Sequence, residues 1–311
     1  MHNRRVSVSK ISSVKERDKE EKNMWLGILT LLMIVALYLI IEIYRETHTF
    51  VVTHYEIESE KLSKESGGIR IAFLSDFHNQ EYGPKSCNLV RAIAAENPDY
   101  ILIGGDMLVG KKGHSYENAV NFVSQLPKIA PVYYANGNHE QRMHENTEKY
   151  GETYNKYKAI LEKAGVHFLV NEKTVVEKNG QKIEIAGMEL PKGIYVKASH
   201  YMLKEEEIEA RIGKSGENYT ILLAHHPKYA EEYWKWGADL ALSGHLHGGV
   251  VRLPIIGGVI SPQIHLFPYY SGDCYRSEGK TMVVSKGLGT HTLNIRLWNR
   301  AELVILTLNG K

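Results

Sequence analysis

The sequence predicts an α/β fold that follows a membrane-spanning helix at the amino terminus. Three observations support this prediction: a long uncharged apolar run near the start, short apolar segments that alternate with amphipathic ones after residue 69, and a polar cluster directly after most of the short apolar segments. Short apolar segments are typical of buried strands, and amphipathic segments are typical of helices. Open α/β sheets place their functional sites at the carboxyl ends of strands, where these clusters fall.

The composition limits the classes of function. In a chain of 311 residues, 38 Lys and Arg nearly balance 36 Asp and Glu, so no overall positive field favours a nucleic-acid partner. Cys87 and Cys274 are far apart and in no Cys-x-x-Cys pattern, which argues against a disulfide framework and against a cysteine zinc site. The 15 histidines exceed what core packing needs, and this excess is consistent with metal chemistry.

The apolar run at residues 24–41 is long enough to be a membrane anchor. At a helical rise of about 1.5 Å per residue, it nearly crosses a hydrocarbon core roughly 30 Å thick. Trp25 near one end and Tyr44 near the other suit the interfacial belts. We therefore predict a transmembrane signal anchor over residues 24–44. Residues 1–23 are basic, so the positive-inside rule predicts that they form a cytoplasmic tail and that the rest of the chain lies outside the cytoplasmic membrane.

Alternatives to this anchor are a cleaved signal peptide, a buried core helix, and an enzyme domain that faces the cytoplasm. Signal peptides usually carry an apolar region of about 7–15 residues and an Ala-x-Ala-like cleavage site. No such site follows the run, and Arg4-Arg5 lies too far from it for a twin-arginine signal. An uncleaved anchor is therefore favoured. The polar residues 45–66 predict a linker, either a tether or a peripheral strand, and the folded domain covers residues 67–311.

Three strand–helix units open the domain. Their strands and helices are predicted at residues 69–75, 85–96, 100–103, 116–126 and 132–135. Because the strands of such units are parallel, their carboxyl ends meet at one edge of the sheet. The side chains that follow the three strands are suited to hold an ion, and they are Asp76, His78, Asp106, Asn138 and His139.

The second half of the domain adds two more strands that end in histidines. A helix at 147–164, a hairpin at Asn179-Gly180 and a helix at 204–212 come first. Buried strands are then predicted at 219–224 and 239–243, and the histidines after them are His225, His245 and His247. Glycines around the last two histidines let the backbone bend sharply enough to aim both rings at one place. Strands of a second sheet are expected at residues 281–285, 293–297 and 303–308.

Two short motifs in this region match other enzyme classes only in part. Residues 105–111 have the G-x-x-x-x-G-K spacing of a phosphate-binding loop, but Lys112 stands where Ser or Thr should hold magnesium. His139-Glu140 with His144 has one residue too many for a zinc-protease helix, because positions i and i+5 do not share a helical face.

The motifs, in this order, resemble the calcineurin-like metallophosphoesterases. They are Asp-x-His at 76–78, Gly-Asp at 105–106, Gly-Asn-His-Glu at 137–140, the strand-end His225, and Gly-His-x-His at 244–247. The similarity runs from about residue 69 to residue 308, and the residues after Gly248 resemble the bacterial membrane-associated branch of the family. The resemblance implies a four-layer α/β/β/α metallophosphoesterase sandwich with two metal ions.

The resemblance also implies a role for each motif residue. Seven residues would be metal ligands: Asp76, His78 and His247 for the first ion, Asn138, His225 and His245 for the second, and Asp106 bridging both. His139 would lie outside the ligands, near the leaving group, so that Asp106 and His139 are the catalytic candidates. His225 matches the ligand position better than the adjacent His226, which stays an alternative.

The chemistry of these residues gives an independent reason for the set. Nitrogen and oxygen donors without a thiolate favour manganese, iron or zinc over copper. Two divalent ions about 3.5–4 Å apart can activate a shared water and clamp the attacking and leaving oxygens. Two aspartates offset only half of the metal charge, so the site attracts a phosphoryl group. His139 can protonate the departing alkoxide.

The sequence therefore predicts a membrane-anchored, metal-dependent phosphoester hydrolase, either a phosphatase or a phosphodiesterase. Lipid-linked or cell-envelope phosphoesters are attractive substrates, although the motifs do not distinguish monoesters, diesters and pyrophosphates. The alternative is a non-catalytic metal-binding envelope protein on the same fold. No feature of the sequence indicates an oligomeric state.

Several other residues have an ordinary structural explanation. Arg252 is expected in an ion pair rather than on phosphate. The apolar residues Ile255, Ile256, Ile264, Leu266 and Phe267 could form a wall beside the site, but ordinary packing is favoured. Six histidines outside the motifs are expected at the surface or in structural contacts, and two of them near the closing loops, His265 and His291, could instead reach substrate; the other four are His114, His144, His167 and His200.

Overall fold

The computed structural model describes residues 2–196, 199–261, 266–290 and 294–311. The chain divides into two compact units, residues 1–45 and residues 46–311. The amino-terminal unit consists of most of helix α1 (His2–His48). Within the described residues, α1 is the one helix whose length and apolar composition suffice to cross a membrane. The predicted anchor therefore falls in a continuous helix.

The first sheet of the domain carries the three predicted strand–helix units. Its strand order is β1-β14-β2-β3-β4-β5. Strands β2 to β5 are parallel, β14 is antiparallel to β2, and β1 is parallel to β14. The bounds are β1 (Phe50–Ser59), β2 (Ile69–Leu74), β3 (Tyr100–Ile103), β4 (Val132–Tyr134), β5 (Val166–Phe168) and β14 (Ala301–Gly310).

The second sheet carries the two later histidine motifs. Its strand order is β12-β13-β9-β8-β7-β6, with β13, β9, β8 and β7 parallel and an antiparallel strand at each edge. The bounds are β6 (Glu172–Lys178), β7 (Gln181–Met188), β8 (Tyr219–Ala224), β9 (Leu240–Ser243), β12 (Asp273–Ser277) and β13 (Lys280–Val284). A separate two-stranded ribbon is formed by β10 (Arg252–Leu253) and β11 (Gly257–Gly258).

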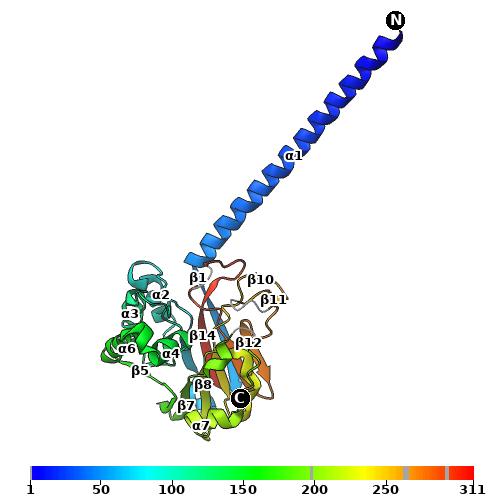
Figure 1. The fold of residues 1–311 in the computed structure, drawn as a ribbon. Coiled ribbons are helices and arrows are strands. Elements are labelled where there is room, and N and C mark those ends of the chain that lie inside the picture. The colour runs from blue at the N-terminus through cyan, green and yellow to red at the C-terminus, as the bar shows by residue number, and fades with distance from the viewer. Residues whose placement is uncertain (1, 197–198, 262–265, 291–293) are drawn as a thin grey trace. The chain divides into compact units, whose positions relative to one another are not determined.

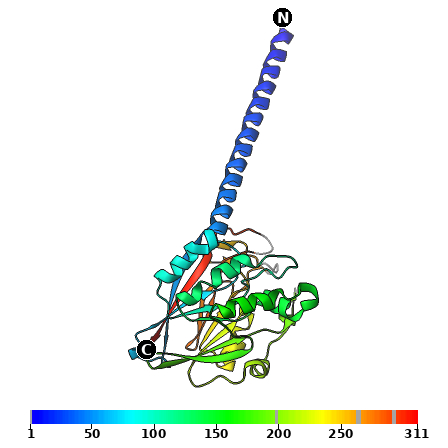
Figure 2. The ribbon, with the colours of Figure 1, turned by 90° about the vertical axis from the view of Figure 1, so that its left-hand side faces the viewer.

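Helices cover the outer face of each sheet, which gives the four-layer α/β/β/α arrangement (Figures 1 and 2). The α-helices of the domain are α2 (Cys87–Ala95), α3 (Glu117–Val123), α4 (Asn138–Glu145), α5 (Thr147–Tyr150), α6 (Thr153–Lys163), α7 (Glu205–Ile212) and α8 (Ala230–Trp236). Short 3₁₀ turns are η1 (Lys64–Ser66), η2 (Pro84–Ser86), η3 (Leu126–Lys128), η4 (Lys192–Tyr195) and η5 (Pro227–Tyr229).

Three apolar clusters hold the four layers together. One joins the first sheet to α2, α3 and α6, and another joins the second sheet to α7 and α8. Between the sheets, Phe73 and Leu306 of the first sheet share a cluster with Leu223 and Leu242 of the second. Because each sheet is covered on both faces, its central strands read as continuous apolar runs rather than as alternating ones. The sheet-to-sheet cluster fixes the two sets of strand ends relative to each other.

Three predicted elements differ in the structure. The helix predicted at 147–164 is divided into α5 and α6, because Gly151 has φ 62° and ψ −152°, which no helix can contain. The last strand, β14, lies in the first sheet rather than in the second. Of the segment predicted at 293–297, residue 293 lies outside the described residues, and residues 294–297 form only a single bridge, between Leu297 and Val251.

The polar segment before the domain contains an edge strand. Residues 50–59 form β1 and pair along their whole length with β14, while Ile57 and Leu62 are buried. A tether and a peripheral strand were the two alternatives for residues 45–66, and the fold contains the peripheral strand. The strand matters for stability because it covers the edge of β14, and an uncovered edge is a template for aggregation.

A chain that begins at residue 67 should therefore be less stable than a chain that begins at residue 46. It loses the burial of Ile57 and Leu62, each worth roughly 1.5–3 kcal/mol. A loss of this size lowers the Tm by about 5 °C or more, since 1 kcal/mol shifts a domain of this length by roughly 2–4 °C. Thermal unfolding and size-exclusion chromatography of both truncated proteins would test this. Equal Tm values and equal monomer fractions would contradict it.

Candidate metal centre

The predicted ligands come together at the carboxyl ends of five strands from both sheets. Asp76 and His78 follow β2, Asp106 follows β3, and Asn138 begins α4 after β4. The histidines follow β8 and β9 of the facing sheet. All seven side chains belong to buried residues, namely Asp76, His78, Asp106, Asn138, His225, His245 and His247.

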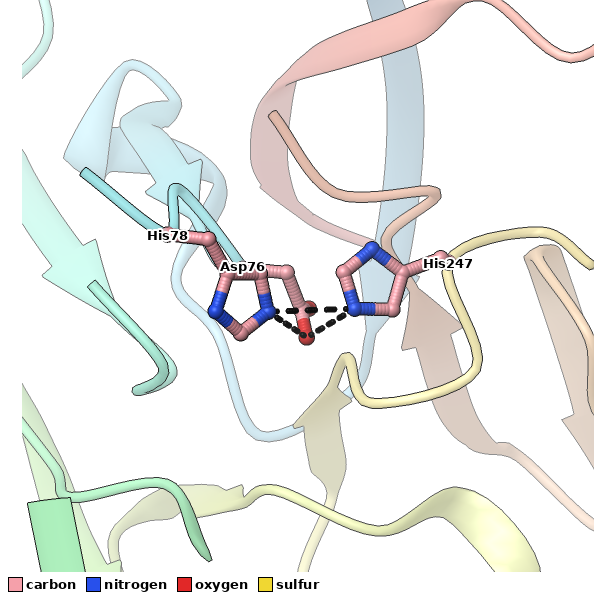
Figure 3. A group of neighbouring side chains, drawn as sticks. All are labelled: Asp76, His78 and His247. Atoms are coloured by element: carbon pink, nitrogen blue, oxygen red, sulfur yellow. Dashed lines mark hydrogen bonds and ion pairs between the residues drawn. The ribbon is translucent and has the colours of Figure 1, made fainter. Parts of the chain in front are cut away.

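The first group consists of Asp76, His78 and His247, whose ligand atoms lie within 4.8 Å of one another. Figure 3 shows the carboxylate and the two rings pointing toward a common centre. Asp76 Oδ1 lies 3.9 Å from His78 Nε2 and 3.3 Å from His247 Nε2. The two Nε2 atoms are 3.2 Å apart.

The second group consists of Asp106, His225 and His245. Asp106 Oδ2 lies 3.1 Å from His225 Nε2 and 4.0 Å from His78 Nε2 of the first group. His225 Nε2 is in turn 3.7 Å from Asp76 Oδ1. Asp106 therefore faces both groups from a position between them.

Backbone carbonyls fix the orientation of three rings. The Nδ1 atoms of His78, His225 and His247 lie 3.0, 2.7 and 2.9 Å from the carbonyl oxygens of Leu108, Gly104 and Gly289. A carbonyl only accepts, so each Nδ1 carries the hydrogen and donates it, and each neutral ring turns an unprotonated Nε2 inward. Outer-shell hydrogen bonds of this kind orient the histidines of metal sites.

The inward atoms fit a cation better than they fit one another. His78 Nε2 and His247 Nε2 face each other at 3.2 Å with a lone pair each, and a cation between them removes that conflict. His225 Nε2 is buried without a hydrogen bond although Asp106 Oδ2 is close. Buried polar atoms without partners are costly. The donor set of carboxylate and imidazole is also one that binds divalent transition metals.

The Asn138 side chain lies beside the second group. With its amide nitrogen inward it donates to His245 Nδ1 and Asp106 Oδ2 at 2.8 and 3.2 Å, and its oxygen accepts from Arg142 Nη2 at 3.0 Å. Turning the amide over would present its oxygen to a cation held by Asp106 and His245.

The backbone at the site is strained. Five of the seven residues have positive φ: Asp76 (52°), His78 (48°), Asp106 (54°), His245 (70°) and His247 (52°). Each costs of order 1 kcal/mol or more, and such residues gather at functional sites. The neighbouring glycines are needed for close approach: a Cβ on Gly244 would lie 2.1 Å from Asp76 Oδ2, and one on Gly137 would lie 2.2 Å from Asp106 Oδ1.

The charged groups of the site shift one another's pKa values. The directions of these shifts show that positive charge at the site is favourable. Burial raises the pKa of Asp76 to about 6, against the lowering effect of His225. Burial also acts to raise the pKa of Asp106, but His225 and His139 beside it hold the pKa well below its usual range. Burial acts to lower the pKa of His225, but the two aspartates raise it to about 10. Without a cation, the two carboxylates thus favour the protonated, positively charged form of His225. A bound divalent ion would supply the same compensating positive charge.

His139 lies beside this group with a defined proton. Its Nδ1 accepts a hydrogen bond from the Gly110 N–H at 2.7 Å, so the hydrogen of the neutral ring is on Nε2. Nε2 is 3.8 Å from Asp106 Oδ2. His139 also forms a group with His78 and Asp106, whose ligand atoms lie within 4.8 Å of one another. Because its Nε2 carries the hydrogen, this nitrogen is suited to donate a hydrogen bond at the centre rather than to bind a cation.

Glu140 holds the loop of Asp106 in place, a role that none of the sequence motifs indicates. Its Oε2 accepts from the N–H groups of Asp106 and Gly137 at 2.8 and 3.1 Å. Its Oε1 accepts from Leu108 N–H at 3.0 Å and from the Tyr134 hydroxyl at 2.9 Å. Burial and the charge of Asp106 raise the pKa of Glu140 to about 7.

Two further buried residues near the carboxyl terminus support His247. Arg296 donates through Nη2 to the carbonyls of Lys286, Gly287 and Gly289, and the last of these also accepts from His247 Nδ1. Asn299 Nδ2 donates to the His247 carbonyl at 2.7 Å. No motif contains these residues, because they act on backbone atoms and lie some 50 positions from the histidine.

Residues that resembled other motifs stay outside the centre. Lys111 is exposed, and His144 is exposed and packs on Tyr154. His114, His167 and His200 are exposed as well, as expected. Arg252 forms the expected ion pair, with Asp273. His265, His291 and Ile264 lie outside the described residues.

Glu140→Gln should destabilise the domain by about 2–4 kcal/mol. Whichever way the amide turns, one of its two ends presents a donor to buried N–H groups, and each buried group without a partner costs roughly 1–3 kcal/mol. Denaturant unfolding in the presence of a chelator measures this without a contribution from metal. Glu148→Gln, an exposed change on the neighbouring helix α5, is the control and should stay within about 0.5 kcal/mol of the parent. Equal stability of the two variants would contradict the role of Glu140.

Comparisons with known proteins agree with this geometry. Residues 69–249 match the family model described as calcineurin-like phosphoesterase. An uncharacterized metallophosphoesterase of Aquifex aeolicus is 32% identical over 284 residues, covering 90% of this chain and 99% of the relative. The phosphodiesterase YaeI of Escherichia coli is 29% identical over 246 residues, covering 77% of this chain and 82% of the relative.

A third relative carries a membrane-spanning region by name. It is a transmembrane protein with metallophosphoesterase domain from Danio rerio, 28% identical over 270 residues, covering 83% of this chain and 57% of the relative. Together with the matched family model and the buried Asp/His groups, these similarities establish that the chain belongs to the calcineurin-like phosphoesterase family of metal-dependent phosphoester hydrolases.

Proposed function

We propose that this protein is a membrane-anchored hydrolase that uses two divalent metal ions to cleave phosphoesters outside the cytoplasmic membrane. The observation that carries the proposal is the position of Asp106, whose Oδ2 faces His225 at 3.1 Å and His78 at 4.0 Å. A carboxylate between two groups of inward nitrogen atoms is suited to bridge two cations.

The ligands divide into two sets. Asp76, His78 and His247 would hold one ion, while Asn138, His225 and His245 would hold the other, with Asp106 shared. Manganese, iron and zinc suit this donor set. When bound, such a metal pair supplies an activated water and neutralises charge on the phosphoryl group.

The protein's own residues provide the rest of the chemistry. The two aspartates leave the metal pair with a net positive charge, which favours a phosphate anion. His139 carries its hydrogen on Nε2, on the side of Asp106, and would donate a hydrogen bond through it to the leaving oxygen, which takes up its proton from water. The hydrogen bond from Gly110 to Nδ1 keeps this tautomer in place. The complete set of ligands favours catalysis over a purely metal-binding role.

The amino-terminal helix supports the localisation. We assign residues 1–23 to a basic cytoplasmic tail, 24–44 to an uncleaved transmembrane anchor, 45–66 to the connection and 67–311 to the catalytic domain. Support comes from the length and apolar composition of α1, and from the relative whose name states a transmembrane protein. The basic residues before the apolar run favour an external domain.

The substrate class follows from the anchor. An enzyme fixed to a bilayer meets esters of lipids and envelope polymers more often than soluble esters. We therefore propose a lipid-linked or cell-envelope phosphoester as the substrate.

Asp106→Asn should abolish hydrolysis of a nitrophenyl phosphodiester and lower the amount of bound metal, because the shared ligand loses its charge.

His139→Ala should keep the metal and lose about 10²–10⁴-fold in kcat/KM. If His139 stabilises the leaving oxygen by a hydrogen bond, the loss should be larger for an alkyl ester than for the nitrophenyl ester, whose leaving group is already stable as an anion. Kinetics, metal analysis and circular dichroism measure these effects.

His144→Ala is the matched control, since His144 is an exposed histidine on the same helix. It should retain full activity on both esters. Full activity of Asp106→Asn and His139→Ala would exclude the mechanism.

A topology reporter fused after Lys311 should be active only outside the cytoplasm. Alkaline phosphatase needs the external compartment for its disulfides, while green fluorescent protein exported in the unfolded state does not fluoresce there. We expect phosphatase activity without fluorescence. The opposite pattern would place the catalytic domain in the cytoplasm.

A further inference from the structure

Most of the exposed large apolar side chains of the described domain lie in three loops of its carboxyl-terminal part; the ones elsewhere are Ile160, Val175, Val196 and Met202. Packing was the favoured explanation for Ile255, Ile256, Leu266 and Phe267, and this is wrong, because all four are exposed. Two more exposed apolar residues lie just before β14. We call the whole set the apolar rim; it consists of Ile255, Ile256, Leu266, Phe267, Ile295 and Trp298.

Backbone hydrogen bonds join the three loops into one surface. Residues 254–256 connect β10 to β11. Phe267 N–H donates to the carbonyl of Val259 at 2.9 Å, and Leu266 bridges to Ile260. On the other side, Arg252 N–H donates to the Leu297 carbonyl at 3.1 Å. The rim is therefore a single hydrogen-bonded structure.

This structure is linked to the point at which the chain enters the domain. Asn299, which follows Trp298, donates its N–H to Glu46 Oε2 at 2.6 Å. Glu46 is the first residue of the domain, and β1 begins four residues later, beside Ala301. Figure 1 draws β10 and β11 at the same end of the domain as the start of β1.

The same entry point is close to the predicted end of the membrane span. Glu46 follows Ile41, the last residue of the uncharged run, by five helical steps, a distance of about 7.5 Å at 1.5 Å per residue. This distance holds for any angle between the helix and the domain. In the proposed topology, the short connection therefore keeps the loops that carry the rim close to the bilayer surface.

The composition of the rim fits a lipid interface. The described residues 250–261, 266–272 and 294–300 contain no Asp or Glu, and Arg300 is exposed beside them. Ile255 is fully exposed with φ 71°, an uncommon conformation for a β-branched residue. Apolar and aromatic side chains with nearby cationic groups are typical of surfaces that insert into the headgroup region of anionic membranes.

The rim also adjoins the loop of the metal centre. Asn299 Nδ2 donates to the His247 carbonyl, and the chain runs from His247 directly into β10. We propose that the apolar rim docks into the bilayer interface and sets the metal centre against the headgroup layer. The inference rests on the proposed function and deepens it: the substrate is a phosphoester whose apolar part stays in the membrane.

The test uses the full-length chain in vesicles of phosphatidylcholine and phosphatidylglycerol. Cys87 and Cys274 are replaced by Ser, and a single cysteine at position 255 or 267 carries an environment-sensitive fluorophore. The matched control is Val175→Cys, since Val175 is 51% exposed on β6 and outside the rim. Rim labels should shift to the blue, be quenched by nitroxide-bearing lipids, and resist aqueous iodide. The label at position 175 should show no blue shift and no quenching by the nitroxide lipids, and aqueous iodide should quench it readily.

Two outcomes would overturn the proposal. Rim labels quenched by iodide as readily as the label at 175 would mean that the rim stays in water. Rim labels protected from iodide but not quenched by the nitroxide lipids would mean that a protein surface, such as a second copy, covers the rim.

A second measurement separates this inference from the proposed function. Ile255→Asp with Phe267→Asp should lower the hydrolysis of a long-chain nitrophenyl phosphodiester in the vesicles by roughly tenfold to hundredfold, since each change removes a large apolar side chain that the bilayer buries when the rim is docked. Hydrolysis of a water-soluble nitrophenyl phosphodiester should be unchanged. An equal effect on both esters would contradict docking, while no hydrolysis of either ester by the parent protein would contradict the proposed function alone.

Discussion

The structure of the site depends on one buried carboxylate, that of Asp106. Its Oδ1 accepts the His139 N–H at 2.8 Å, and its Oδ2 faces the nitrogens of His78, His139 and His225. A buried anion of this kind is stable only when positive charge or donors surround it. The protein supplies part of that environment through histidines, and Glu140 holds the loop through its N–H groups. The remaining negative charge of Asp106 favours bound cations, and so do the lone pairs that both histidine groups turn inward.

The four layers of the fold bring this arrangement about. Parallel strands of one sheet deliver the aspartates and His78, and parallel strands of the other deliver the remaining histidines. The apolar cluster between the sheets fixes the distance between the two sets. Strained turns at Asp76, Asp106 and His247 are maintained because the strands before them are buried and cannot shift. Stability of the sandwich is thus what keeps the ligands converging.

The sequence was a good guide to the parts of the protein that depend on local patterns. Apolar segments predicted the strands before Asp76, Asp106 and His225, because buried parallel strands are continuous apolar runs. The motif residues were found because polar residues at strand ends share one edge of a sheet. Other parts could not be found this way. The place of β14 in the first sheet depends on long-range pairing, and Arg296 and Asn299 act on backbone carbonyls far away in sequence. The exposure of Ile255 and Phe267 also follows from tertiary structure alone, since an apolar loop reads the same whether it is buried or not.

The central claim is that the two groups of ligands hold a pair of ions with Asp106 between them. Electron paramagnetic resonance of the metal-depleted protein reloaded with Mn²⁺ tests this most directly, because two ions about 3.5–4 Å apart share a bridging ligand and couple their spins. We predict the signal of a coupled pair in the parent protein. A spectrum of isolated Mn²⁺ ions at full metal loading would contradict the account.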